Sequence, residues 1–184
     1  MRRILRLVTA LALTAAAPAQ PPPAKRLPPA GIAISAQDRA ELAAGAAALR
    51  AEIDALAAKP EPSTHAGVSR YLPDVEIFHK AVDWALRYDE FFDPKQVVFA
   101  RHLLAVGRER AAQLRAGQTP WLNAGGMVIR AYRSKIDGSV QPFAVVLPPG
   151  WKRDAGLPRR LDVVLAGRGE KRTELAFIAE HEKS

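Results

Sequence analysis

Cysteine is absent from the 184 residues of this chain. Its absence excludes disulfide bonds, zinc sites with thiolate ligands, a cysteine nucleophile and the acylated cysteine of a lipoprotein. We therefore expect packing alone to stabilise the fold. Histidine is scarce too, and the four that are present share no spacing or neighbouring carboxylates that would complete a metal site: His65, His79, His102 and His181. We predict no metal and no cofactor.

Long apolar runs are also scarce, and the one that is present lies at the N-terminus. Residues 4–17 are largely apolar, and three arginines lie within the first six residues. A run of about 14 residues falls short of the roughly 20 that cross a bilayer as a helix. The small residues Ala17 and Ala19 suit the cleft of a signal peptidase. These features predict a signal peptide over residues 1–19, a secreted or periplasmic location and no stable membrane span.

Acidic residues are outnumbered by basic ones, 19 against 27, which gives a formal net charge of +8. Three arginines lie in the predicted signal peptide, so the mature excess falls to about +5. One loop gathers basic residues beside a single aromatic, Trp151: Lys152, Arg153, Arg159 and Arg160. We interpret it as a solvated loop, because single-stranded nucleic-acid surfaces combine basic residues with several stacking aromatics. The sequence therefore predicts no nucleic-acid partner.

The overall composition, 48% hydrophobic and 25% charged, is that of a globular domain. Removal of the signal peptide leaves about 165 residues, enough for one ordinary domain. Residues 20–34 depart from this composition, because they contain five prolines. Such a segment favours extended polyproline conformations and forms neither a helix nor a strand ladder. We predict a Pro-rich linker over residues 20–34.

Residues 35–118 carry helical patterns, and the first of them begins at Ser35. Asp38 stands three residues later, as in a capping box. Apolar residues then recur at spacings of three and four and form one stripe: Leu42, Ala46, Leu49, Ile53 and Leu56. We favour packing of this stripe against a neighbouring helix. Two heptads are few for a coiled coil, so dimerisation through the stripe is the alternative.

Two further helices are predicted in the same region. The second starts near Pro73, and the third starts at Pro94, with Asp93 as its N-cap and Gln96 as the reciprocal cap. The third ends at Gly117, a residue type that often follows a helix.

Acidic and aromatic residues gather around the join between these two helices. We interpret the acidic ones as helix caps and solvated side chains rather than an ion site: Asp83, Asp89, Glu90 and Asp93. The aromatic ones are predicted to be core or domain-contact anchors: Trp84, Phe91, Phe92 and Trp121.

Beyond residue 119 the pattern changes from helical to extended. Residues 127–134 alternate, Asp137 and Gly138 form a typical hairpin turn, and residues 143–147 complete an antiparallel hairpin. The apolar run at residues 161–165 predicts a third strand, buried in a sheet that is covered on both faces. A glycine turn follows over residues 166–170, and residues 173–182 have helical composition.

This order of hairpin, strand and Gly-x-Gly turn resembles the opening of secreted α/β-hydrolases. It is most similar to the prolyl-oligopeptidase-type peptidases and related esterases, and the likeness covers residues 127–184. The resemblance implies a mixed α/β fold, in which an N-terminal α-helical extension precedes the first strands of an incomplete α/β-hydrolase sheet. Residues 119–184 are then the N-terminal part of a truncated hydrolase domain.

The resemblance also implies a role for the glycine turn. In the family, the loop after the third strand supplies a backbone donor to the oxyanion hole. In this chain the donor is expected to be the N–H of Arg168 or Gly169, with Gly167 giving the backbone room to approach. The family usually has His-Gly at the end of this strand, whereas Ala166 stands here. The expected substrate is a peptide or a carboxylic ester.

The family also requires a Gly-x-Ser-x-Gly elbow, an acid and a histidine after that strand. No such elbow is present: Ser69 follows Gly67 by two residues without a second glycine, and Ser139 lies in the hairpin turn. The sequence thus predicts the N-terminal portion of an exported serine hydrolase that is inactive by itself. The alternative is a secreted helical protein-interaction module without catalytic activity, recruiting its partner through the apolar stripe.

Overall fold

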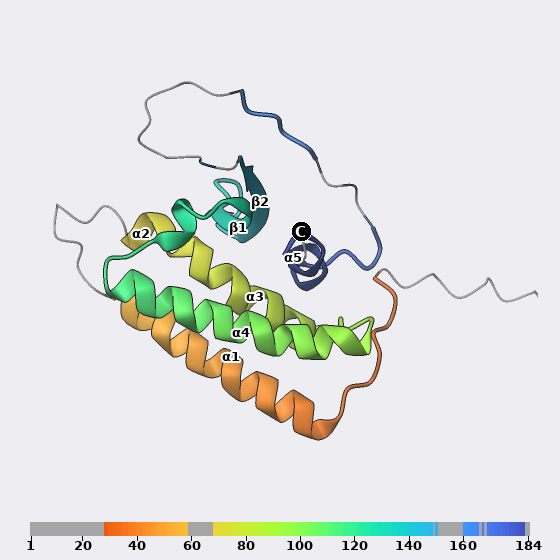
Figure 1. Cartoon of the computed structure of the whole chain (residues 1–184). Helices are drawn as coiled ribbons and strands as arrows, with labels where there is room; N and C mark the ends of the chain where they lie inside the picture. Colours follow the sequence, from red (N-terminus) through yellow and green to blue (C-terminus); the bar gives the residue numbers. More distant parts are fainter. Residues whose placement is uncertain are drawn as a thin grey trace, which may run out of the picture.

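A computed structural model describes residues 28–58, 68–148, 150, 160–165, 167 and 169–182 of the chain (Figure 1). Several predicted features lie outside these residues: the signal peptide, most of the Pro-rich linker, residues 151–159 of the basic loop, and Arg168. The described elements are, in chain order, α1 (Ala36–Ala57), α2 (Val68–Tyr71), α3 (Pro73–Arg87), α4 (Pro94–Arg115), the short 3-10 helix η1 (Pro120–Leu122), β1 (Gly126–Arg133), β2 (Val140–Leu147) and α5 (Glu174–His181).

The predicted helix starts are confirmed by their caps. The Ser35 hydroxyl accepts the Asp38 amide at 3.0 Å and donates to the Asp38 carboxylate at 2.7 Å. At α4, Asp93 accepts the Lys95 amide at 2.7 Å. Gln96 reaches one residue farther back than expected, because its side-chain oxygen accepts the Phe92 amide at 2.6 Å. These local bonds satisfy amides that a helix start leaves without partners.

The apolar stripe of α1 is buried inside the chain. Leu42 and Leu49 have no exposed surface, and Ile53 and Leu56 are 1% exposed. Close packing of α1 against α3 and α4 requires Gly107, since a Cβ there would lie 2.6 Å from Leu49 Cδ2. The favoured prediction of intrachain packing is confirmed. The interaction-module alternative therefore has no free surface in this stripe.

The hairpin is antiparallel, as predicted. Its register pairs Arg133 with Val140 at the turn and Gly126 with Leu147 at the open end. The second strand is longer than the sequence predicts, because it begins at Val140 rather than at residue 143. Gly138 takes a φ of 72° in the turn, a conformation that glycine adopts without strain. The hairpin lies beside α3, with α5 close by (Figure 1).

One buried carboxylate joins the helices to the hairpin. Asp74, in the first turn of α3, is 1% exposed. Its oxygens accept the Ala131 amide at 2.7 Å, Arg130 Nε at 2.8 Å and Trp121 Nε1 at 3.0 Å. Trp121 is thus a core anchor, as predicted. A carboxylate with three donors can be buried without an uncompensated charge, so this contact fixes the position of β1 on the bundle.

Arg110 makes a second link between α4 and the hairpin. Its guanidinium donates to the Ile129 carbonyl at 2.8 Å and lies 4.8 Å from the centre of the Phe78 ring. Burial lowers the pKa of Arg110 to about 10, so the side chain is still charged at neutral pH. Helices and hairpin therefore share one core.

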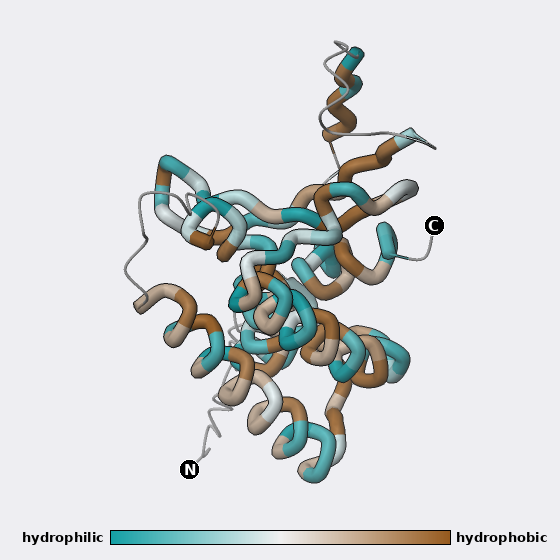
Figure 2. Tube along the Cα trace, turned by 60° about the vertical axis from the view of Figure 1, so that its left-hand side comes forward, coloured by the Kyte–Doolittle hydropathy of each residue, from teal (hydrophilic) through white to brown (hydrophobic). Residues whose placement is uncertain are grey.

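The predicted third strand is not formed. Residues 160–165 form neither a strand nor a helix, and the sheet in the described part of the chain consists of β1 and β2. The apolar side chains of the segment are exposed: Leu161 by 82%, Val163 by 74%, Val164 by 90% and Leu165 by 87%. The segment stands away from the rest of the molecule (Figures 1 and 2). The prediction was wrong because a buried strand needs neighbours on both sides, and the described part of the chain supplies none.

The chain returns to the core at α5, where the predicted helix is confirmed. The Thr173 hydroxyl caps it by accepting the Ala176 amide at 3.2 Å. Leu175 and Ile178 have no exposed surface. They pack α5 among α3, α4 and the hairpin.

Candidate functional site

The predicted oxyanion loop lies on the surface. Gly167 and Gly169 are both exposed, and Arg168 lies outside the described residues. The Gly167 carbonyl accepts the Arg172 guanidinium at 3.1 Å, and the Gly169 carbonyl accepts the Arg172 amide at 3.2 Å. Arg172 also pairs with Glu180 of α5. These contacts tie the loop to α5.

Gly167 was predicted to give the backbone room for a close approach, but none of the described residues comes close to where a side chain would lie. A Cβ built there would have no heavy atom within 4 Å. Neither Gly167 nor Gly169 lines the cleft described below. The loop therefore forms no pocket by itself, and its role as an oxyanion donor stays a prediction.

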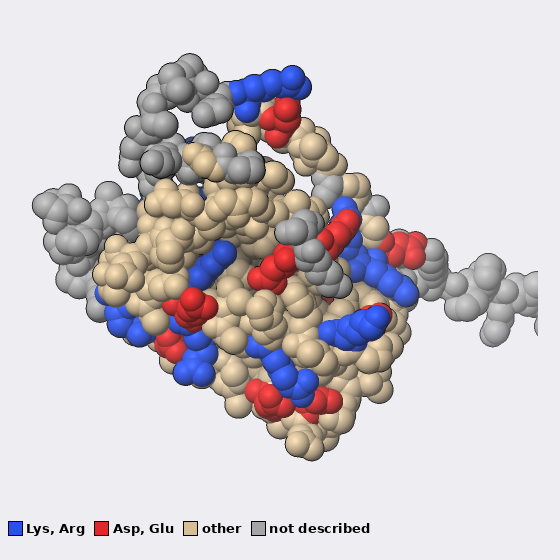
Figure 3. Space-filling view, viewed as in Figure 1, with Lys and Arg blue, Asp and Glu red and all other residues tan. Residues whose placement is uncertain are grey.

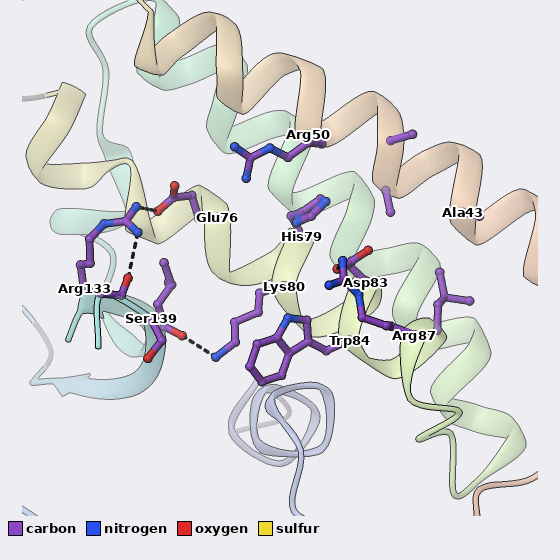
Figure 4. Close-up of a pocket in the computed structure, with 15 residues that line it drawn as sticks. Ala43, Arg50, Glu76, His79, Lys80, Asp83, Trp84, Arg87, Arg133 and Ser139 are labelled. Carbon is purple, nitrogen blue, oxygen red and sulfur yellow. Dashed lines mark hydrogen bonds and ion pairs between the residues drawn. The ribbon is translucent and has the colours of Figure 1, made fainter. Parts of the chain in front are cut away.

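A cleft with a volume of about 730 Å³ lies between α1, α3 and the hairpin turn (Figure 4). We call it the α1–α3 cleft. Helix α1 contributes three alanines and Arg50, and the turn contributes Arg133 and residues 138–140. Helix α3 contributes most of the functional groups: Glu76, His79, Lys80, Asp83, Trp84 and Arg87.

The arginines of the cleft are all neutralised by carboxylates. The pairs, each partly exposed to solvent, are Arg50 with Asp54, Arg87 with Asp83, and Arg133 with Glu76. Exposed pairs of this kind add little to stability. Their chemical effect is to place hydrogen-bond donors and acceptors side by side along the cleft without a net charge.

Lys80 is the buried cation of the cleft, with 8% of its surface exposed. Its ammonium donates to the Val140 carbonyl at 2.8 Å and pairs with Glu174 at 2.6 Å. It also lies 4.1 Å from the centre of the Trp84 ring. A buried ammonium needs such partners. Lys80 therefore fixes α5 and β2 to α3 and holds the indole of Trp84 in place.

His79 is half-buried at the edge of the core. Burial lowers its pKa, so the imidazole is neutral at pH 7. In the described part of the chain, its ring feels the charges of Asp83 and Arg50 but makes no hydrogen bond to another residue. A neutral imidazole has one donor and one acceptor nitrogen. His79 therefore offers the cleft two free hydrogen-bonding groups.

Ser139 lies in the same cleft but has no nucleophilic arrangement. Its hydroxyl donates to Asp137 at 2.8 Å and accepts Gln141 Nε2 at 2.7 Å. Hydrogen bonding to Ser139 lowers the pKa of Asp137. The residue stands in a hairpin turn rather than in a strand–elbow–helix connection, which agrees with the sequence analysis.

The other histidines have separate surroundings. His102 of α4 lies 3.3 Å from Glu182, and His181 Nδ1 lies 2.8 Å from the Phe177 carbonyl. His65 lies outside the described residues. Within the described ranges, no group of three or more His, Asp or Glu side chains is placed to hold a metal ion.

Most of the acidic and aromatic residues around the join of α3 and α4 stabilise the fold. Asp83 and Asp89 form ion pairs with Arg87 and Arg39, and Asp93 caps α4. Phe91 is 1% exposed, but Trp84 is 37% exposed, at the wall of the cleft. The prediction that Trp84 is a core anchor was therefore wrong: the indole lies at the cleft wall, against the ammonium of Lys80.

Sequence reasoning missed the cleft because its walls come from distant segments. Its residues lie at positions 43–50, 76–87 and 133–140, which only the packing of α1, α3 and the hairpin brings together. One signal was present: on α3, polar residues recur at positions 76, 79, 80 and 83, beside an otherwise apolar stripe.

The surface shows no concentration of one charge on the face seen in Figure 3, where basic and acidic side chains are interspersed. None of the described helices is long and apolar enough to cross a membrane. Comparison of the chain with protein-family models, with curated proteins and with solved structures finds no significant match in any of the three.

Proposed function

We propose that this chain is the N-terminal portion of an exported serine hydrolase that cleaves peptide or carboxylic ester bonds. The proposal combines the resemblance of residues 127–184 to α/β-hydrolases with one structural observation. That observation is the exposure of the apolar segment 161–165, directly after an antiparallel hairpin.

The exposure supports the proposal because apolar side chains are unfavourable in contact with water. Leu161, Val163, Val164 and Leu165 are each at least 74% exposed and follow one another closely along the chain. Contiguous apolar surface of this kind marks a site that another part of a protein covers. Residues rich in Val and Leu, with β-branched side chains, suit a strand that is covered on both faces. Further strands of a hydrolase sheet would supply that cover.

The proposal divides the catalytic groups between this chain and residues that follow it. The backbone amide of Arg168 or Gly169 would donate to the oxyanion, and Gly167 would give the backbone room to approach. Removal of one such donor raises a barrier by roughly 3 to 4 kcal/mol. The nucleophile, acid and histidine would follow Ser184, so the chain alone would not turn over substrate.

The test compares this chain with a longer product that includes the residues encoded after Ser184. A fluorophosphonate probe is expected to label one serine of the longer product, which also hydrolyses a p-nitrophenyl ester. The matched control replaces that serine by alanine, and this chain alone should show neither property. A reading frame that ends at Ser184, or that continues without a Gly-x-Ser-x-Gly elbow, overturns the proposal.

A further inference from the structure

The α1–α3 cleft has the features of a second, independent binding site. Its volume of about 730 Å³ is within the range of small-molecule pockets. All of the residues that line it belong to this chain, and the oxyanion loop is not among them. Ligand binding in the cleft is therefore independent of the proposed hydrolase function.

The charge balance of the cleft limits the kind of ligand. Each arginine in its wall has a carboxylate partner, and Lys80 is paired with Glu174. An anion or a cation would have to break one of these pairs to gain an ionic contact. A neutral ligand can instead accept hydrogen bonds from the guanidinium groups and donate to the carboxylates while the pairs stay intact.

His79 adds hydrogen-bonding groups that nothing else in the described structure uses. Figure 4 shows its ring between Arg50 of α1 and the Asp83–Arg87 pair of α3. Since burial keeps the imidazole neutral, it presents one donor and one acceptor. A hydroxyl group matches it, because a hydroxyl both donates and accepts.

Trp84 gives the cleft a flat apolar surface. The indole is held by the ammonium of Lys80 and by an edge-on contact with Tyr88, with ring centres 5.8 Å apart. It nevertheless keeps 37% of its surface exposed. On the α1 side, Ala43, Ala46 and Ala47 are too small to fill the space. A ring with one apolar face can therefore enter beside the indole.

A compact neutral ring that carries several hydroxyl groups meets all of these conditions. We propose that the α1–α3 cleft binds a neutral saccharide unit, with Trp84 against the sugar ring and His79 hydrogen-bonded to its hydroxyls. The paired Arg87 and Asp83 supply adjacent donor and acceptor groups for neighbouring hydroxyls.

The test is an NMR titration of the whole chain with D-glucose, D-galactose and maltose, up to about 50 mM, a range suited to weak binding. The readouts are the ring signals of His79 and the indole N–H of Trp84. At least one sugar should shift both signals saturably. Inorganic phosphate and glycerol, as the anionic and the small-polyol probes, should not.

Variants locate the site. His79→Ala and Trp84→Ala are each expected to weaken binding by at least about tenfold, the effect of losing 1.4 kcal/mol. The matched controls are His102→Ala on α4 and Tyr132→Ala on β1, which lie outside the cleft and should leave binding unchanged. Circular dichroism confirms that each variant is folded.

The titration of the unsubstituted chain decides the outcome even if a variant does not fold. Absence of saturable shifts with all three sugars overturns the proposal. Saturation by phosphate instead shows an anion site, and an equal loss of binding in the control variants places the sugar elsewhere; either result overturns the assignment.

Discussion

The hairpin and the segment 161–165 are both built from apolar, β-branched residues, yet they differ in what surrounds them. In β1, Val128, Ile129 and Ala131 are between 3% and 7% exposed, because α3 and the buried carboxylate of Asp74 cover the strand. In the segment, every apolar residue is at least 74% exposed. Strand-forming composition is therefore not sufficient, and the partner surface decides whether a strand forms.

The largest expected effect tests what holds the hairpin on the bundle. Asp74→Ala removes the acceptor of three hydrogen bonds and leaves Arg130 and Trp121 without their partner. Breaking a buried charged network of this kind costs about 3 to 5 kcal/mol. Urea unfolding measures the loss. The matched control, Asp54→Ala on the exposed face of α1, should cost less than about 1 kcal/mol. Equal losses in the two variants would contradict the central role of Asp74.

A second substitution tests the packing of α1 against α3 and α4. Gly107→Ala places a Cβ 2.6 Å from Leu49 Cδ2 and 3.1 Å from Phe78 Cβ. Leu49 has no exposed surface, and the Cβ of Phe78 is fixed to the backbone of α3, so the new methyl group crowds atoms that have little room to move. Overpacking of this kind costs about 1 to 3 kcal/mol.

Gly45→Ala is the matched control for this prediction, because Gly45 is also inside a helix. Its new Cβ would lie 2.8 Å from Leu104 Cδ1, the end of a flexible side chain that can turn away. The better helix propensity of alanine, by about 1 kcal/mol, then offsets the crowding. The midpoint temperature of thermal unfolding should be clearly lower for Gly107→Ala than for Gly45→Ala. The reverse order would show that the interface around Gly107 is loosely packed.

A smaller effect is expected from the titration of His79. Burial lowers its pKa in the folded chain below the unfolded value of about 6.5, so the unfolded state takes up the proton first as the pH falls. The neutral His79 side chain therefore contributes fully to the free energy of unfolding at pH 7, and this contribution is lost as the pH drops below about 6.5. Urea midpoints at pH 7 and pH 5 should differ less in His79→Gln than in the unsubstituted chain. In the control His102→Gln, the difference between the urea midpoints at pH 7 and pH 5 should not shrink by the same amount.

The smallest effect is expected in the segment that the bundle does not cover. Val164→Asp changes a side chain that is 90% exposed, so the free energy of unfolding should change by no more than about 0.5 kcal/mol. Val128→Asp, in the covered strand β1, is the contrasting substitution and should destabilise the chain strongly, because it buries an unpaired charge. Thermal unfolding of both variants tests the comparison between hairpin and segment. A large loss in Val164→Asp would mean that the segment packs against the core.

Local features of the fold could be predicted from the sequence, and long-range ones could not. Ser35 and Asp93 mark helix starts through bonds to residues two or three positions away. Asp74, by contrast, bonds Trp121 and Arg130, which lie 47 and 56 positions further along the chain. No local pattern encodes that contact. The cleft around His79 was missed for the same reason, since it joins segments that are distant in sequence.

The prediction for residues 161–165 failed for a related reason. Their composition is that of a buried strand, but burial depends on neighbouring strands, which the described part of the chain does not supply. The glycines at positions 167 and 169 were predicted to stand at the end of that strand. They instead lie in an exposed turn that Arg172 ties to α5.

Hydrogen–deuterium exchange across the chain tests most directly whether residues 161–165 lack a partner while the bundle and hairpin fold without them. Amides of α1, α3 and β1 should be strongly protected, because they are hydrogen-bonded within a buried core. Amides of residues 161–165 should exchange at the rate of an unstructured chain, and should become protected in the longer product. Protection of the segment equal to that of β1 in this chain alone would contradict the account.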